Sequence, residues 1–267
     1  GDGISYCDEC GIVYAVPNLK IVGGVAAVPY RFSANRYNIK QHSNELYLTI
    51  FFSHNIYSWP ATVLVYFKYK KLIYIGGSYQ LYDYSVQCGG TLIDRRFVLT
   101  AAHCIPTEFT LSYNGQVYTF SITTNSYYPT IESMFTVFVG VYDLSQIYNS
   151  QATSISVSKV IVNENYNNII ELNDLSLLKL ASDAPLTQYV QVACLPNPKI
   201  TGYPTSYNIY SWVNGWGDIY GNSTFPIQLH NVKITIYDPS ACKSVYPTVA
   251  KNWLGQICAG NVSGGII

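Results

Sequence analysis

Three residues of this chain are of the types that nucleophilic catalysis by a hydroxyl group uses. Ser263 stands before two glycines in NVSGG, His103 lies near the end of LTAAHC, and Asp174 opens DLSLLKL. A serine hydroxyl attacks a carbonyl carbon efficiently only when a neighbouring base takes its proton. Histidine suits that task because an imidazole titrates near neutral pH. Taken one at a time, His103 would more often be structural and Asp174 an ordinary loop carboxylate.

Four segments are stronger evidence of function together than singly, because they occur in one order along the chain. They are KIVGG (20–24), CGGTLIDRRFVLTAAHC (88–104), NDLSLLKL (173–180) and NGWG (214–217). Singly, the first is an ordinary turn entering a strand and the last is a turn with a packed tryptophan. Their combination makes a chance match improbable.

This set resembles the trypsin and chymotrypsin family of serine endopeptidases over residues 21–30 and 58–260. LTAAHC is the most specific match, and CGGTLI ahead of it strengthens the resemblance. The resemblance implies an all-β fold of two six-stranded antiparallel barrels with the active site between them. It also implies catalytic residues in the chain order His, Asp, Ser.

Carried over by matching motif, the resemblance assigns His103 as the general base and Asp174 as its partner. His103 would take the serine proton during attack and return a proton to the leaving amine. Asp174 would hold the ring in the required tautomer and stabilise the imidazolium. Lys20 before Ile21 would be the activation cleavage site, and the freed Ile21 ammonium would pair with an aspartate beside the nucleophile.

Seven cysteines scattered through a strand-rich chain favour disulfides and an oxidising, extracellular compartment. The odd count leaves one thiol unpaired or bonded outside the chain. The resemblance implies three pairs and leaves Cys7 without an obvious partner. These pairs are Cys88 with Cys104, Cys242 with Cys258, and Cys10 with Cys194.

Ser263 does not match the position of the family nucleophile. That serine lies in a GDSGG motif a dozen or more residues after the cysteine that Cys258 matches, whereas Ser263 follows Cys258 by five residues. Asn261 and Val262 stand where Gly-Asp would be required. We therefore expect a surface-loop role for Ser263 and a chain that stops before the nucleophile, with the second barrel incomplete. A chain of this kind is expected to be an inactive fragment of an active endopeptidase.

The composition of the chain limits the classes of partner that it is expected to bind. The chain is 49% hydrophobic and 11% charged with a net charge of zero, so it can form a sizeable core but lacks a basic field for nucleic acid or an anionic membrane. The sequence contains no run of about 18 apolar residues, so no membrane-spanning helix is predicted. The expected partners are protein or peptide substrates, an activating protease and protease inhibitors, with no cofactor and no metal.

Short runs rich in β-branched and aromatic residues must position the candidate site. Gly, Pro, Asn and Asp bound them, and their spacing suits an antiparallel barrel or sandwich. The predicted strands lie at 61–67, 71–75, 90–93, 96–100, 135–141, 175–180 and 229–237. Residues 239–246 read as a short helix capped by Asp238.

The expected organisation is an activation segment at 1–20, a first barrel at 21–190 and part of a second barrel at 191–267. Residues 31–57 interrupt the family pattern with a stretch rich in Asn, Ile, Tyr and Phe. Residue types with AT-rich codons favour a translated intron there over a long surface loop.

Two other functions compete with proteolysis. One is a protease-like binding protein whose catalytic residues have decayed, although intact His103 and Asp174 argue against it. The other is a non-functional gene-model product, which the stretch at 31–57 favours. The primary specificity of the parent enzyme is not encoded in these residues.

Overall fold

The computed structural model describes residues 59–148, 152–169, 172–196, 204, 206–218, 225–245 and 256–260. Regular structure in these ranges is almost entirely β-strand. The strands are β1 (Thr62–Ile75), β2 (Ser78–Asp94), β3 (Phe97–Thr100), β4 (Glu108–Tyr113), β5 (Gln116–Ser121), β6 (Phe135–Val139), β7 (Thr153–Val162), β8 (Ser176–Leu180), β9 (Ile209–Gly215), β10 (His230–Tyr237) and β11 (Cys258–Gly260). The helical segments are η1 (Ala102–Cys104), η2 (Glu132–Met134), η3 (Leu144–Gln146) and α1 (Pro239–Val245).

The chain divides into two compact units. One comprises Thr62–Val141 and Ile147–Pro185 and carries β1 to β8. The other includes Tyr142–Gln146 and Leu186–Ile267, and its described residues carry β9, β10, β11 and α1. The expected activation segment at 1–20 and the stretch at 31–57 lie outside the described residues.

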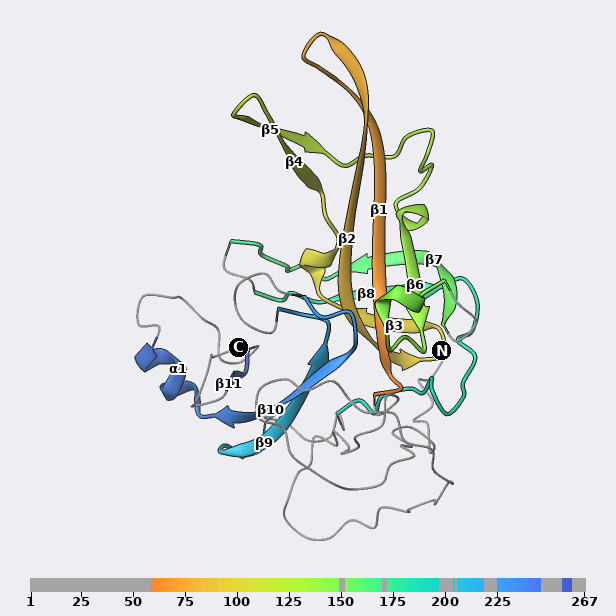
Figure 1. Cartoon of the computed structure of the whole chain (residues 1–267). Helices are drawn as coiled ribbons and strands as arrows, with labels where there is room; N and C mark the ends of the chain where they lie inside the picture. Colours follow the sequence, from red (N-terminus) through yellow and green to blue (C-terminus); the bar gives the residue numbers. More distant parts are fainter. Residues whose placement is uncertain are drawn as a thin grey trace. The chain divides into compact units, whose positions relative to one another are not determined.

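Six strands of the first unit close into an antiparallel barrel in the order β1-β2-β3-β8-β7-β6 (Figure 1). The all-β fold class expected from the sequence is confirmed. Strand alternation explains the burial in β8, where Ser176, Leu178 and Leu180 are buried while Leu177 and Lys179 are half-buried. The fully buried side chains of the barrel include Val63, Leu64, Val65, Leu92, Val98, Val137, Val139, Leu178 and Leu180.

Close packing explains the second glycine of CGGTLI. A Cβ at Gly90 would lie 2.8 Å from Val98 Cγ1 and 3.1 Å from Val63 Cγ2. Those two side chains belong to β1 and β3, the strands on either side of β2, and are both fully buried. Because a tightly packed interior cannot absorb an added methyl group cheaply, this position requires glycine.

The hairpin formed by β1 and β2 continues past the barrel as a two-stranded ribbon (Figure 1). β1 pairs with β6 only over Val63–Phe67, and β2 pairs with β3 only from Thr91 onward. The two strands nevertheless pair with each other as far as Ile75 and Ser78. The two strands predicted at 61–67 and 71–75 are therefore one, because the intervening residues stay in register with β2.

A second hairpin, β4 with β5, packs against one face of this ribbon through an aromatic cluster. The Phe109 ring stacks on Tyr82 at 5.1 Å and on Tyr84 at 5.4 Å between ring centroids. Tyr69 approaches it edge-on at 5.9 Å, and Phe109 is only 3% exposed. Stacked and edge-on aromatic pairs of this kind each add about 0.5–1.5 kcal/mol to the burial of their area. The cluster therefore holds the ribbon against the second hairpin.

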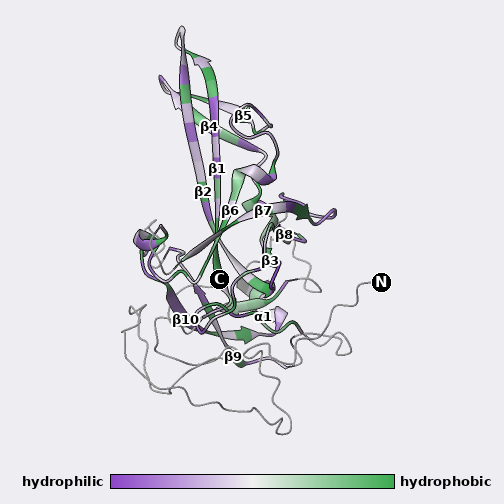
Figure 2. Cartoon of the chain, turned by 90° about the vertical axis from the view of Figure 1, so that its right-hand side faces the viewer, coloured by the Kyte–Doolittle hydropathy of each residue, from purple (hydrophilic) through white to green (hydrophobic). Residues whose placement is uncertain are grey.

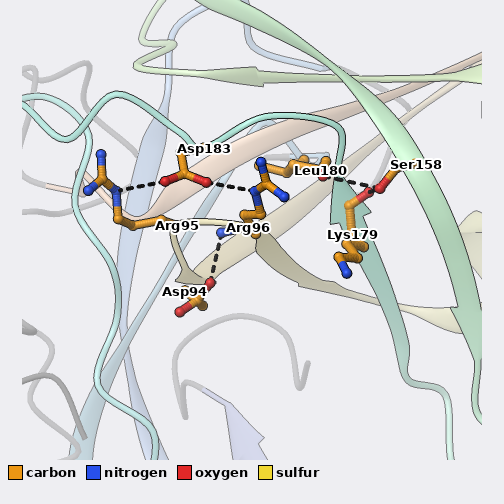
Figure 3. Close-up of polar contacts among 7 residues, drawn as sticks. All are labelled: Asp94, Arg95, Arg96, Ser158, Lys179, Leu180 and Asp183. Carbon is orange, nitrogen blue, oxygen red and sulfur yellow. Dashed lines mark hydrogen bonds and ion pairs between the residues drawn. The ribbon is translucent and has the colours of Figure 1, made fainter. Parts of the chain in front are cut away.

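The turn between β2 and β3 is tied to the end of β8 by charged and backbone groups (Figure 3). Arg96 Nε donates to Asp183 Oδ1 at 2.6 Å, and Arg95 Nε lies 3.8 Å from Asp183 Oδ2. The Leu180 amide donates to the Arg96 carbonyl and the Ala184 amide to the Arg95 carbonyl, both at 2.8 Å. Because the charged side chains are half exposed, each pair contributes at most about 1 kcal/mol.

The second unit contains a three-stranded antiparallel sheet in the order β11-β10-β9. Cys242 on α1 is bonded to Cys258 on β11. The Ser240 amide donates to Asp238 Oδ1 at 2.9 Å, so Asp238 caps the short helix that the sequence placed at 239–246. No helix in the described residues is both long and apolar enough to cross a membrane.

Candidate active site

Strand register places His103 and Asp174 at the same end of two neighbouring strands. β3 and β8 pair antiparallel, and Thr100 at the end of β3 lies opposite Ser176 at the start of β8. His103 follows Thr100 by three residues, and Asp174 precedes Ser176 by two. Both side chains therefore emerge at one rim of the barrel although 71 residues separate them along the chain.

Both oxygens of the Asp174 carboxylate bind His103. Oδ2 lies 2.7 Å from His103 Nδ1, and Oδ1 accepts the His103 backbone N–H at 2.8 Å. A ring that donates Nδ1–H to this carboxylate leaves Nε2 as its free acceptor. The His103 side chain is 64% exposed, whereas that of Asp174 is 26% exposed. The pair therefore presents an accessible, oriented base supported by a largely covered acid.

The backbone on either side of Asp174 is held by neighbouring amides. Asn173 adopts the left-handed conformation with φ of 55°, which asparagine tolerates better than most residues. Its Nδ2 donates to the Asn165 carbonyl at 2.8 Å, and the Leu175 carbonyl accepts the Asn163 amide at 3.0 Å. The loop before β8 thus fixes the direction in which the Asp174 side chain leaves the chain.

A disulfide secures the segment that carries His103. Cys88 on β2 is bonded to Cys104, the residue after the histidine, with 6.2 Å between the Cα atoms. Ala102 and Cys104 are buried, and Thr100 Oγ1 donates to the Gly89 carbonyl at 2.8 Å. The two cysteine sulfurs and a ring nitrogen of His103 lie within 4.8 Å of one another. Bonded to each other, these sulfurs are not the thiolates that metal coordination requires.

The contacts of Asp174 set its pKa below the usual range. Partial burial of the carboxylate acts to raise the pKa, because burial disfavours charge. Hydrogen bonds from the His103 side chain and backbone and from the Ala102 backbone, together with the charge interaction with His103, outweigh that effect and lower the pKa. Asp174 therefore stays ionised under conditions in which it must orient the imidazole.

This lowered pKa predicts a pH-dependent contribution of Asp174 to stability. The contribution is fully present above the unfolded-state pKa of about 3.9 and is lost as pH falls through the lower folded-state pKa. Urea unfolding of the protein and its Asp174→Asn variant, measured across a pH series, tests this. We expect the variant to be less stable at neutral pH and the gap to narrow below about pH 4. A gap independent of pH would contradict the assigned hydrogen bonds.

The structure describes only some of the other residues that the sequence analysis singled out. Cys194 is disulfide-bonded, while Cys10 lies outside the described residues. Lys20, Ile21 and Ser263 also lie outside them, so their assigned roles stay predictions. Sequence reasoning missed Asn173 as a positioning residue. An asparagine directly before the aspartate was the available signal, because asparagine is enriched at positive φ.

Comparison with known proteins identifies the family. The family model described as Trypsin matches residues 52–266, which is most of the chain. The chain belongs to the trypsin family. The resemblance inferred from LTAAHC and its companion motifs is thereby confirmed.

Individual relatives of this trypsin-family chain have low sequence identity to it, but the similarity extends over most of the chain. It is 26% identical to chymotrypsin-C of Bos taurus over 265 residues, covering 96% of the chain and 72% of the relative. It is 30% identical to chymotrypsin-like elastase family member 1 of Rattus norvegicus, covering 76% of the chain but only 62% of that relative. The chain therefore spans less than two thirds of the length of the elastase relative.

Solved structures agree with the trypsin-family fold. A structure of GrC superposes with a TM-score of 0.55 at 26% identity, covering 78% of the chain and 73% of GrC. Neuropsin, a serine protease expressed in the limbic system of mouse brain, superposes with a TM-score of 0.53 at 22% identity, covering 79% of the chain and 73% of neuropsin. The latter likeness concerns the fold alone.

Proposed function

We propose that this chain carries the general base and the orienting acid of a secreted serine endopeptidase. The observation that supports it most strongly is the contact of Asp174 with both the ring and the backbone of His103, at 2.7 Å and 2.8 Å. A trypsin-family chain with its family histidine and aspartate held in this arrangement is suited to activating a hydroxyl nucleophile.

In the proposed reaction, His103 Nε2 removes the proton of a serine hydroxyl as that oxygen attacks the scissile carbonyl carbon. Asp174 accepts the Nδ1–H bond throughout and stabilises the imidazolium that forms. The imidazolium then gives its proton to the leaving amine as the carbon–nitrogen bond breaks. Water hydrolyses the resulting acyl-enzyme by the same steps, with His103 again as base.

The nucleophile is the part of this proposal that the 267 residues do not supply. They contain no Gly-Asp-Ser-Gly-Gly segment, and Ser263 lies in Asn-Val-Ser-Gly-Gly instead. We propose that Ser263 is a loop residue and that the chain by itself is an inactive fragment of the enzyme. Without that serine, His103 has no nucleophilic hydroxyl to deprotonate.

Maturation and partners complete the proposal. Cleavage after Lys20 by an activating protease would free the Ile21 ammonium and convert a zymogen into the active form. Protein or peptide substrates and protease inhibitors are the proposed partners. The bonds Cys88–Cys104 and Cys242–Cys258 support secretion, because disulfides persist in oxidising compartments.

The decisive experiment compares the 267-residue chain with the product of the complete reading frame from the same transcript. Both proteins would be offered peptide esters with basic, aromatic and small residues before the scissile bond. We expect the longer protein to hydrolyse at least one class and the 267-residue chain to hydrolyse none. Turnover by the shorter chain would refute the proposed absence of a nucleophile. A complete frame without a glycine-flanked serine would favour a non-catalytic binding protein.

A further inference from the structure

The outer end of the β1–β2 ribbon exposes four large side chains on one face. Leu72 pairs with Leu81 and Tyr74 with Tyr79 across the two strands. Directly opposed residues of an antiparallel pair share a face, and so do alternate residues along one strand. The exposed fractions are 54% for Leu72, 52% for Leu81, 63% for Tyr74 and 70% for Tyr79. We call these four residues the ribbon patch.

The opposite face of the ribbon is covered along β1, so the exposure of the patch does not reflect a hairpin that is unpacked on both sides. Ile73 and Ile75 are 4% and 7% exposed, and Tyr82 stacks on Phe109 of the second hairpin. Gly76, in the turn with φ of 63°, lies so close to Tyr113 that an added Cβ would collide with its hydroxyl. The ribbon is therefore braced on one side and open on the other.

Positive charge lies immediately behind the patch. On the face that carries the patch, Lys68 and Lys70 are accompanied by one carboxylate, Asp83, so two positive charges less one negative charge leave one, while Lys71 lies on the opposite face. Asp83 is paired with Lys70 at 3.2 Å. Lys68, Lys70 and Leu72 are every second residue along β1, so both lysines lie on the face that carries the patch. Apolar segments of the ribbon alternate with polar ones toward its end (Figure 2).

We propose that the ribbon patch binds the surface of an anionic lipid membrane. Leu72 and Leu81 would enter the acyl boundary, while Tyr74 and Tyr79 would sit at headgroup level, where a ring with a polar end is favoured. The lysines behind them would meet the lipid headgroups, because long cationic stems reach past apolar surface to charge. The membrane would hold the protein at the surface without any segment crossing the bilayer.

Size favours a lipid surface over a protein partner. A stable protein interface uses about 20–30 residues a side, whereas the end of a two-stranded ribbon presents only the four residues of the patch. A bilayer needs no complementary shape, so a narrow projecting end can insert where it could not anchor a protein. The sequence suggested no membrane partner because the net charge is zero and no long apolar run is present. The patch instead draws single residues from two strands that alternate with polar ones.

Vesicle binding tests the proposal with the 267-residue chain. We would measure co-sedimentation with vesicles of phosphatidylcholine alone and of phosphatidylcholine mixed with phosphatidylserine. We expect binding to the mixed vesicles, weakened by added salt because exposed charges are screened. The double variants Leu72→Ser with Leu81→Ser, and Tyr74→Ser with Tyr79→Ser, should each bind at least about tenfold more weakly because buried apolar area drives insertion.

The matched control is Ile169→Ser, which removes an 87% exposed side chain elsewhere in the same unit and should bind like the parent. Circular dichroism would confirm that every variant is folded. The parent's failure to sediment with mixed vesicles would overturn the proposal without relying on any variant. Equal binding by the ribbon variants would also overturn it. A lipid-independent dimer lost in those variants would assign the patch to a second copy of the chain. Because no hydrolysis is measured, the outcome is independent of the proposed function.

Discussion

Replacing Asp174 by asparagine is expected to lower kcat of the complete enzyme by about 10⁴-fold, with a much smaller change in KM. The amide can occupy the same space, but it cannot accept hydrogen bonds at both of its terminal atoms. His103 Nδ1 and the His103 backbone N–H now each meet a carboxylate oxygen, at 2.7 Å and 2.8 Å. One contact becomes donor against donor unless the ring changes tautomer, and that change places the proton on Nε2, where the base must accept one.

His103→Ala should be at least as damaging, and the double variant should be little worse than the single ones. Residues that act as one unit lose their joint effect once, so their individual losses do not add. Steady-state kinetics on the best substrate would measure both constants. Near-additive losses, or a loss confined to KM, would argue against the proposed proton transfer.

Asp183→Asn is the matched control for Asp174→Asn. Asp183 is also a carboxylate of the first unit and also accepts a side-chain hydrogen bond, from Arg96 Nε at 2.6 Å. It is half exposed, and its pairs lie at the turn between β2 and β3. We expect kcat to stay within about twofold of the parent, because an exposed ion pair contributes at most about 1 kcal/mol to stability and Asp183 does not touch the base. A comparable loss in both variants would indicate general disruption of the barrel.

Removing the Cys88–Cys104 disulfide by a double serine substitution is expected to cost about 3 kcal/mol of stability. The bond closes a loop across a sequence separation of 16, and its loss restores chain entropy to the unfolded state. Because Cys104 directly follows His103, the histidine segment should also become less ordered. We therefore expect kcat of the complete enzyme to fall, beyond any loss of folded protein.

Cys242–Cys258 supplies the matched control, because it has the same sequence separation of 16. Removing it should cost a similar amount of stability but leave the His103–Asp174 hydrogen bond intact. Urea unfolding measures the stability cost, and the proton NMR resonance of the His103 Nδ1–H bond reports the contact in either chain length. The proposal predicts that this resonance is lost or broadened only when Cys88 and Cys104 are replaced. Identical spectra for the two double variants would show that the disulfide does not position the base.

The local sequence predicted both the short helix and the strands that lead to the candidate site. β3, β6, β8, β10 and α1 all overlap predicted segments, because β-branched and aromatic runs favour extended backbone and Asp238 caps the helix start. β7 was not predicted, although Ile155 and Val157 alternate with serines along it. β4 and β5 were not predicted either. Their aromatic residues are stabilised mainly by contacts with the ribbon, which no local pattern reveals.

The sequence by itself indicated the family and the all-β class, which are confirmed, and it predicted two candidate catalytic residues, because such chemistry depends on short motifs such as LTAAHC. Only the tertiary structure decided that those residues meet. The register that sets Thr100 opposite Ser176 closes a 71-residue separation between His103 and Asp174, and β-pairing at that range depends on the packing of the whole barrel. The ribbon patch was decided in the same way. Leu72 and Leu81 share an exposed face only because two strands pair in one register while the second hairpin covers the other side.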